Sequence, residues 1–296
     1  MIDNLLSSLR VIAIPMRTQF RGITSREVAL MQGENGLVEF SPFVEYGDDE
    51  AARWLACTLE AAIQNDFPIF RTHVGMNGTI PETNDEATLN EIVSRFEGVS
   101  TFKVKVGTDI NQDIWRLRSV RTLRPDTKVR IDVNGTWKPR DAATYIASMY
   151  DAIGDIEYVE QPCQTIDELR DLKSQLTVPV KIAADEVIRK ARDPFSINLD
   201  GAADIVVLKV QPLGGIARSL AIAAHHKKPV VVSSALESSV GLAYGVRLAQ
   251  AIENLQYDCG LATHNLFSGE GVDVAPDRFD WWKNRIMRAA KVLETQ

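Results

Sequence analysis

The sequence predicts an α/β protein in which a (β/α)7β barrel of the TIM-barrel type carries a small α+β capping domain. Two observations lead to this fold class. From about residue 69 onward, short apolar runs alternate with segments of helical periodicity, as in a parallel sheet covered by helices. Polar residues also end successive apolar runs at intervals of 24 to 28 residues, which suits one βα unit. We expect the capping domain at residues 1–66, completed by residues 265–296, and the barrel at residues 67–264.

The opening of the chain mixes strands and one helix. Its β-type runs are RVIAIPM, EVALMQG and LVEFSPF, with a hairpin signal at Asn35 and Gly36 between the last two. A polar loop that contains Arg21 separates the first two runs. Residues 48–65 have apolar side chains at helical spacing and predict a helix. The tail at residues 276–291 is polar with two tryptophans, and we expect it to pack back on this domain.

The barrel strands are predicted, in chain order, at IFRTHVGM, FKVKVG, VRIDVNG, IEYVEQP, VKIAADE, IVVLKVQ and VVVSSALE, with a weak eighth strand at residues 259–263. Helices are predicted after them at about residues 87–96, 111–123, 141–153, 165–176, 193–200, 216–226 and 240–252. Asp141 and Thr165 are predicted N-caps, and Thr165 forms a capping box with Glu168. An open, doubly wound sheet is the alternative, but it does not require polar residues at the same place on successive strands.

The composition excludes several classes of protein. The 296 residues are 45% hydrophobic and 25% charged, which is ordinary for a globular chain. A net charge of −7 without a long basic run argues against nucleic-acid binding. The sequence shows no 18-residue apolar span and no secretory leader pattern, and its three cysteines lack CxxC spacing. We therefore expect a cytoplasmic protein without a nucleic-acid or membrane partner, and a monomer is compatible with the sequence.

Three carboxylates end successive predicted barrel strands: Asp132, Glu160 and Asp185. In a barrel these strand ends converge on the mouth, where active sites lie. Three carboxylates without His or Cys are oxygen ligands suited to a hard dication, Mg²⁺ first and Mn²⁺ second. The alternative is that each carboxylate caps a helix or pairs with a lysine. Asn134, on the same strand face as Asp132, and Glu186 are candidate partners outside the ligand set.

Three lysines accompany these carboxylates. Lys103 and Lys105 are two residues apart in one strand and share a face, while Lys209 ends a strand about half a turn around the barrel. Lys103 and a dication would lower the pKa of Lys105 from about 10.4 towards about 7 to 8, where lysine can act as a base. The predicted chemistry is removal of a proton next to the carboxylate of a small substrate, with the metal stabilising the enediolate. The alternative chemistry is formation of a Schiff base between one of the lysines and a substrate.

Two other candidates have an ordinary structural interpretation beside the functional one. Gly214 and Gly215 follow Lys209, and either present backbone amides to an anion or form a simple turn. Arg130 shares a strand face with Asp132, and either pairs inside the barrel or contacts the substrate.

At these residues the sequence resembles the enolase superfamily, in its muconate-lactonizing subgroup. The resemblance rests on KVK at residues 103–105, on the Asp, Glu and Asp that end successive strands, and on Lys209. It spans the capping domain and the whole barrel. The stretches RGITSREVAL, GLVEFSPF, RIDVNGTW, YVEQPC, ADEVIRK, VLKVQPLGG and SSALESSVGLAYG further resemble a dehydratase branch of the subgroup, in its compact actinobacterial form. One departure is Val187, where relatives usually read Ser after ADE.

The resemblance implies a Mg²⁺-dependent syn-dehydration of 2-succinyl-6-hydroxy-2,4-cyclohexadiene-1-carboxylate to o-succinylbenzoate, a step of menaquinone biosynthesis. Carried over by position, Lys105 would be the base and then the acid for the departing hydroxyl, and Lys209 a cation over the developing ring. Asp132, Glu160 and Asp185 would hold the metal.

The succinyl arm is expected at Ser233 and Ser234, which end the seventh strand, with help from Gly214 and Gly215. The loop that contains Arg21 is expected to close over the mouth. The same catalytic set serves N-acylamino acid racemases and dipeptide epimerases of the superfamily, so these activities are the alternative. A barrel kept only as a binding protein would be expected to have lost site residues, and the three carboxylates and both strand-end lysines are present.

Overall fold

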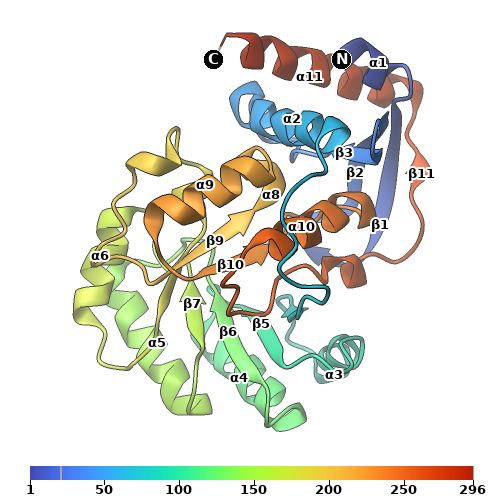
Figure 1. The fold of residues 1–296 in the computed structure, drawn as a ribbon. Helices are drawn as coiled ribbons and strands as arrows, with labels where there is room; N and C mark the ends of the chain where they lie inside the picture. Colours follow the sequence, from blue (N-terminus) through green and yellow to red (C-terminus); the bar gives the residue numbers. More distant parts are fainter. Residues whose placement is uncertain (21, 296) are drawn as a thin grey trace.

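The computed structural model describes residues 1–20 and 22–295 and contains two β-sheets with helices around them (Figure 1). A seven-stranded parallel sheet has the order β10-β9-β8-β7-β6-β5-β4, so neighbouring strands are also consecutive in the sequence. A four-stranded antiparallel sheet has the order β11-β1-β2-β3, so a strand from the C-terminal part of the chain pairs with one from the N-terminal part.

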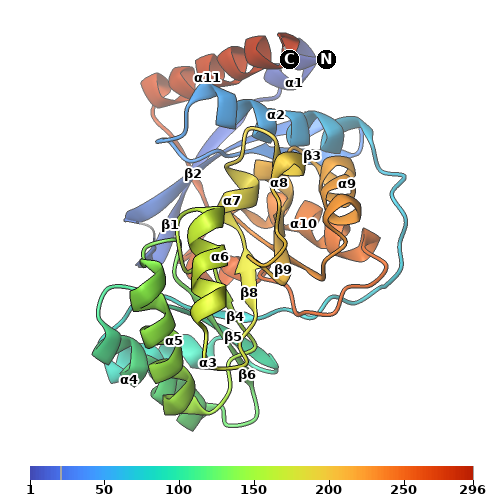
Figure 2. The ribbon, with the colours of Figure 1, turned by 90° about the vertical axis from the view of Figure 1, so that its left-hand side faces the viewer.

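The strands of the parallel sheet are β4 Gly78–Ile80, β5 Thr101–Lys105, β6 Lys128–Asp132, β7 Tyr158–Glu160, β8 Ile182–Ala184, β9 Ile205–Lys209 and β10 Val230–Ser233. The accompanying helices are α3 Glu86–Ser94, α4 Ile110–Leu123, α5 Pro139–Ile153, α6 Ile166–Gln175, α7 Glu186–Arg189, α8 Val210–Leu213, α9 Ile216–His226 and α10 Ser239–Ala251, with 3₁₀ turns η1 Pro194–Ser196 and η2 Thr263–Leu266. Helices lie along the outside of the curled sheet (Figure 2). The predicted alternation of strands and helices is confirmed, except that the helix expected at residues 193–200 is only the 3₁₀ turn η1 and the α-helix after β8 is α7.

Residues near Cys259 fill the eighth position of the barrel. Single parallel bridges join Cys259 to Met76 on one side and Gly260 to Ser233 on the other. The N–H of Gly260 donates to the carbonyl of Val232 at 2.8 Å. The weak eighth strand expected from the sequence is therefore a short segment that closes the barrel.

The first barrel strand is displaced from its predicted position. The run IFRTHVGM is irregular, and β4 begins only at Gly78. Arg71 explains the difference, because its guanidinium donates to the carbonyls of Ala249 and Glu253 at the end of α10, at 2.8 and 2.7 Å. Docking on the end of that helix overrides the strand propensity of the run.

One of the two predicted helix caps is confirmed. Thr165 and Glu168 form the capping box at the start of α6. The prediction for Asp141 is wrong, because α5 already begins at Pro139 with Lys138 as its N-cap. Proline has a helical φ and lacks the N–H that the first turn leaves unpaired, so it starts the helix earlier.

The second unit, which we call the cap, consists of α1 Ile2–Leu6, β1 Arg10–Phe20, β2 Ile23–Gly33, β3 Gly36–Phe40, α2 Asp48–Ile63, β11 Val272–Asp273 and α11 Pro276–Glu294. Helix α11 packs along α2 (Figure 1), so the predicted return of the tail is confirmed. Trp54 of α2 and Trp282 of α11 are both buried in the core of the cap. None of the helices in the described ranges combines the length and apolar character needed to cross a membrane.

Two glutamates of the cap accept hydrogen bonds from the first turns of barrel helices. Glu60 of α2 accepts the N–H of Ile216 in α9. Glu39 of β3 accepts the N–H groups of Ser238 and Gly241, at 3.1 and 3.0 Å, at the start of α10. The first N–H groups of a helix lack intrahelical partners and carry a partial positive charge, so both carboxylates bind the cap to the barrel.

Candidate active site

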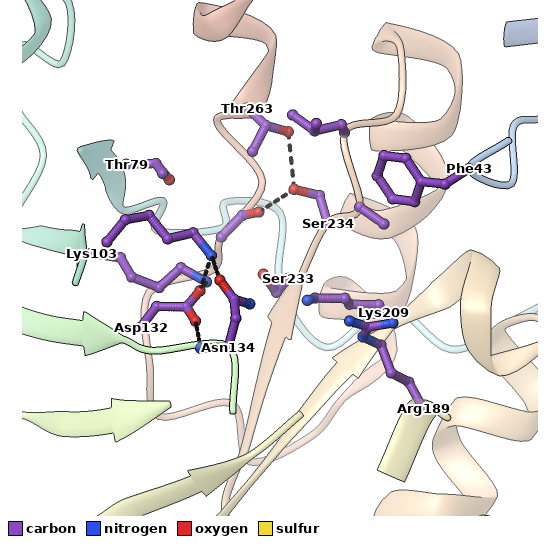
Figure 3. A pocket seen from close by; sticks show the side chains of 14 residues that line it. Phe43, Thr79, Lys103, Asp132, Asn134, Arg189, Lys209, Ser233, Ser234 and Thr263 are labelled. Carbon is purple, nitrogen blue, oxygen red and sulfur yellow. Dashed lines mark hydrogen bonds and ion pairs between the residues drawn. The ribbon is translucent and has the colours of Figure 1, made fainter. Parts of the chain in front are cut away.

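A cavity at the carboxyl ends of the barrel strands lies against the cap (Figure 3). Lys103 and Asp132 line one side of it, and Lys209 faces them from the other side. Lys105 also lines the cavity and lies against Asp132. The cap contributes Phe43. These side chains meet because parallel strands of a barrel all end at the same rim.

Lys103 and Lys105 both reach Asp132, as their two-residue spacing predicts. The Nζ atoms lie 3.1 and 2.6 Å from Asp132 Oδ2, and Lys103 Nζ also lies 3.1 Å from Glu160 Oε1. Burial opposes the charge of Lys103, but Asp132 and Glu160 outweigh it and raise the pKa of Lys103 well above its ordinary value. Burial lowers the pKa of Lys105, and the adjacent Lys103 acts in the same direction against Asp132. The predicted direction for Lys105 is found, with burial as the largest cause.

The three predicted carboxylates are all buried at the ends of neighbouring strands. Asp132 and Glu160 are paired in register across β6 and β7. Burial, together with the charge of Asp132, raises the pKa of Glu160 to about 7. For Asp185 burial acts in the same sense, but Lys209, 2.5 Å away, and Arg189 outweigh it and lower the pKa to about 2.

The chemistry of this donor set fits a divalent metal. The charges of Asp132 and Asp185 both raise the pKa of Glu160, so the three carboxylates repel one another and a nearby dication would relieve the repulsion. Glu186 also has a buried oxygen, Oε2, that lacks a hydrogen-bond partner among the described residues. In residues 1–20 and 22–295 no three acidic, His or Cys side chains are gathered as a ready-made metal cluster. Each of the three carboxylates instead contacts a lysine, and a dication would compete with these cations for the same oxygens.

Asn134 lines the cavity beside Lys105. Its Oδ1 accepts from Lys105 Nζ at 2.7 Å, and its Nδ2 donates to Glu186 Oε1 at 3.2 Å. Both residues expected outside the ligand set therefore lie next to the carboxylates and are joined to each other.

Ser233 and Ser234 line the cavity at the end of β10. Ser234 Oγ donates to the carbonyl of Gly260 at 2.6 Å and lies 2.9 Å from Thr263 Oγ1, so this hydroxyl is engaged with the segment that closes the barrel. Arg21, which was predicted to close over the mouth, lies outside the described residues.

Gly214 and Gly215 lie outside the cavity, which corrects their expected role at the succinyl arm. Gly214 packs against Arg218 and the backbone of Arg53 in α2, and Gly215 lies against Glu60. The anion at the start of α9 is thus the carboxylate of Glu60, a part of the protein itself.

Arg130 pairs inside the barrel, and the expectation that it contacts substrate is corrected. It is 0% exposed, and its Nε lies 2.6 Å from Glu157 Oε2. Its Nη1 donates to Asn77 Oδ1 at 3.0 Å, and its guanidinium lies 4.8 Å from the ring centre of Tyr158. It precedes Asp132 by two residues on the same strand face, so it lies one layer deeper than the cavity.

Several residues that line the cavity were not predicted from the sequence: Thr79, Phe43, Arg189, Leu236 and Thr263. Thr79 pairs with Lys103 in register, so a correct placement of β4 would have found it. Arg189 follows Asp185 by four residues, and this spacing on a helical turn was an available signal. Leu236 has a φ of +61°, which is unusual for a branched side chain and has no signal in the sequence.

Comparisons with known proteins agree with this geometry. Family models match residues 11–62 as "Enolase N-terminal domain-like" and residues 87–286 as "Enolase C-terminal domain-like". An o-succinylbenzoate synthase of Mycobacterium ulcerans (strain Agy99) is 43% identical over a 320-residue alignment that covers 99% of this chain and 96% of the relative. The chain belongs to the o-succinylbenzoate synthase family of the enolase superfamily. Members of this superfamily generally use a divalent metal.

Two further comparisons extend this result. The o-succinylbenzoate synthase of Mycolicibacterium smegmatis is 48% identical over 269 residues, which covers 90% of this chain and 82% of the relative. The solved structure of a dipeptide epimerase from Enterococcus faecalis V583, complexed with Mg and the dipeptide L-Leu-L-Tyr, has a TM-score of 0.72. It is 21% identical and covers 90% of this chain and 91% of its own, so this likeness shows the fold. The predicted barrel with a capping domain is confirmed.

Proposed function

We propose that this chain is an o-succinylbenzoate synthase, a hydro-lyase that converts 2-succinyl-6-hydroxy-2,4-cyclohexadiene-1-carboxylate to o-succinylbenzoate in menaquinone biosynthesis. The observation that carries the proposal is the pair Lys105 and Lys209, which face each other across buried carboxylates in a chain 43% identical to a curated enzyme of that name.

Lys105 is the base of this proposal. Burial lowers its pKa, so a larger fraction of it is uncharged near neutral pH than of a free lysine. It takes the proton from the carbon next to the substrate carboxylate and then gives that proton to the departing hydroxyl. Proton and hydroxide leave from one face of the ring as water, which makes the elimination syn. Lys103 stays charged beside Asp132 and Glu160 and keeps a positive charge next to the base.

Lys209 supplies positive charge on the other side of the substrate, where it stabilises the charge that develops on the ring. Asp132, Glu160 and Asp185 would hold the metal, Mg²⁺ before Mn²⁺, because their donors are all carboxylate oxygens. When bound, the metal stabilises negative charge on the substrate carboxylate. The epimerase from Enterococcus faecalis that shares the fold is complexed with Mg, which supports this choice.

A second candidate function is N-acylamino acid racemisation or dipeptide epimerisation. One observation favours it: Lys209 lies across the cavity from Asp132, and Lys105 contacts Asp132 at 2.6 Å, so each lysine can exchange a proton with one face of a substrate carbon. We place either activity in the cytoplasm, acting on a small carboxylate, because the three cysteines are free and buried, as suits a reducing compartment.

The purified chain with the cyclohexadiene substrate and Mg²⁺ tests the proposal, with product formation followed by ultraviolet absorbance. We expect turnover that EDTA abolishes and that excess Mg²⁺ restores. N-succinyl amino acids are assayed for racemisation in parallel. Racemisation without any dehydration would select the second candidate, and full dehydration in metal-free protein would contradict the metal assignment.

A further inference from the structure

A chain of hydrogen bonds begins at Lys105 and leads away from Asp132. Lys105 Nζ donates to Asn134 Oδ1 at 2.7 Å, and Asn134 Nδ2 donates to Glu186 Oε1 at 3.2 Å. Asn134 has a φ of +54°, a conformation that asparagine adopts more readily than most residues. The proposed base is thereby linked to the first residue of α7.

Arg189 completes the link to the second lysine. Its Nη2 donates to the same Glu186 oxygen at 2.6 Å, and its Nε donates to Asp185 Oδ1 at 3.1 Å. Asp185 Oδ2 accepts from Lys209 Nζ at 2.5 Å. Five hydrogen bonds therefore run without a break between the two lysines, and Arg189 makes the third and fourth of them, counted from Lys105.

The cap holds the same arginine from the other side. Arg189 Nη1 donates to the hydroxyl of Tyr46 at 3.2 Å, in the loop between β3 and α2. Arg53 of α2 donates to the carbonyls of Arg189 and Ala191, at 2.9 and 3.0 Å. The side chain of Arg189 is 6% exposed and all three of its nitrogens are bonded, so barrel and cap together fix its conformation.

We propose that Arg189 is a positioning residue that sets the placement of Lys105 relative to Lys209 and makes this placement depend on the docked cap. The inference rests on the proposed function, in which the two lysines act on opposite sides of the substrate. Misplacing a catalytic group by about 1 Å costs on the order of 100-fold in rate, so a shared anchor for both groups matters. The same guanidinium orients Asp185, so substituting Arg189 should change the affinity for the metal as well as the rate of turnover.

Arg189→Lys tests the proposal, because lysine keeps the charge but cannot bond three partners in a fixed plane. We expect kcat for dehydration to fall 10- to 100-fold with KM within threefold of wild type. The Kd for Mg²⁺, measured by calorimetry without substrate, should weaken about tenfold or more. Tyr46→Phe removes the cap hydroxyl that Arg189 Nη1 contacts and keeps the Arg53 contacts, and it should lower kcat three- to tenfold while leaving the Mg²⁺ Kd within twofold.

Arg170→Lys is the matched control. Arg170 also has a forked set of partners, with Asp167 Oδ1 at 2.6 Å and the carbonyl of Asn198 at 3.1 Å, but it lies on α6 away from the cavity. We expect kcat, KM and the Mg²⁺ Kd of this variant to stay within twofold of wild type. Losing the forked contacts of an arginine far from the cavity does not displace the lysines.

The proposal is overturned if folded Arg189→Lys keeps both kcat and the Mg²⁺ Kd within threefold of wild type. It is also overturned if its loss of activity only matches the unfolded fraction seen by thermal melting. Should Arg189→Lys fail to fold, Tyr46→Phe decides, and an unchanged kcat there contradicts the dependence on the cap. A wild-type chain without dehydration or racemisation would overturn the proposed function alone, and Mg²⁺ calorimetry on the same variants would then decide on Arg189.

Discussion

Lys105 and Lys209 end strands on opposite sides of one cavity, yet their surroundings differ. Lys105 shares Asp132 with Lys103 and bonds Asn134, whereas Lys209 has the carboxylate of Asp185 as its partner. Burial lowers the pKa of Lys105, which suits proton transfer. A dehydration on one face needs proton transfer only at this residue, and a racemisation needs it at both lysines.

Substituting each lysine by arginine separates these roles, because arginine keeps the charge but does not act as a base near neutral pH. We expect Lys209→Arg to retain measurable dehydration and to lose racemisation. Lys105→Arg should lose both, with dehydration at least tenfold below that of Lys209→Arg. The ultraviolet and racemisation assays measure the pattern. Similar dehydration rates in the two variants would show that the base is assigned wrongly.

Asp185→Asn keeps the size of a predicted metal ligand and removes its charge. We expect the Mg²⁺ Kd, measured by calorimetry, to weaken at least tenfold and turnover to fall 100-fold or more. Circular dichroism should show an intact fold. Asp167→Asn, at an exposed pair on α6, serves as the control and should behave like wild type. Unchanged Mg²⁺ affinity in Asp185→Asn would contradict its place in the ligand set.

At the residue scale, the sequence predicted those side chains whose position follows from strand periodicity. The two-residue spacing of Lys103 and Lys105 puts them on one face, and both reach Asp132. Strand periodicity shows which face a side chain is on but not how deep in the barrel it lies. For this reason Arg130, which shares a face with Asp132, is also expected near the substrate. Arg189 and Phe43 reach the cavity from α7 and from the cap, and such placement depends on tertiary packing that a local pattern does not contain.

At the scale of elements, the start of α9 depends on a close approach between barrel and cap. Gly215 has a φ of +120°, and an added Cβ would overlap the carboxylate of Glu60. The same carboxylate accepts the first N–H groups of the helix. Glycine is therefore required here both by conformation and by space.

Gly215→Ala should reduce the free energy of unfolding by about 2 to 4 kcal/mol, through backbone strain and overpacking. Urea denaturation measures the change. Gly154→Ala is the control, because Gly154 has a φ of +75° with open space around it, and it should lose only about 1 to 2 kcal/mol. In a double-mutant cycle, Glu60→Ala should remove the steric part, so the two losses should fall short of additivity by about 1 kcal/mol or more. Simple additivity would contradict the clash.

Glu237 gives the contact between cap and barrel a pH dependence. Burial, and after it the neighbouring Glu39, raise the pKa of Glu237 to about 7, against the effect of Arg26. Its Oε2 accepts the N–H of Ala235 at 2.5 Å. The folded state then binds more protons than the unfolded state between about pH 4.5 and 7, so this group makes stability fall as pH rises through that window.

Glu237→Gln removes the titration but keeps an oxygen acceptor for Ala235. Relative to wild type, we expect the variant to gain about 1 to 3 kcal/mol between pH 5 and pH 8. Urea denaturation at a series of pH values measures the difference. Parallel stability curves for the two proteins over this range would show that Glu237 does not titrate in the folded state as described.

Most of the elements could be predicted because buried parallel strands and amphipathic helices have distinct periods. The run IFRTHVGM is one exception, since Arg71 docks it on the end of α10, and the helix expected at residues 193–200 is another, since only the 3₁₀ turn η1 forms there. The contact between the Glu60 carboxylate and the chain that follows Gly214 and Gly215 could not be predicted either. In the sequence, a pair of glycines is equally compatible with an anion-binding site and with a simple turn. Only the structure shows that the anion is the carboxylate of Glu60 in α2.

At the scale of the whole molecule, the cap and the barrel share one functional surface. The cap lines the cavity with Phe43, holds Arg189 through Tyr46 and Arg53, and bonds the starts of two barrel helices. A substitution in the cap is therefore expected to change the position of the lysines even where the substituted residue does not contact them.

The last described helix of this molecule belongs to the cap, whose other helices and long strands come first in the chain, so the cap is completed late in synthesis. A ribosome completes every barrel strand before residues 272–294 leave its exit tunnel. Until then α2 and the antiparallel sheet lack their covering helix, and Phe40 lacks its edge-to-face contact with Trp282. We expect nascent chains arrested near residue 265 to be cleaved by protease within α2, and chains in which residues 276–294 have left the ribosome to resist. Equal resistance in both would show that the cap folds without its final helix.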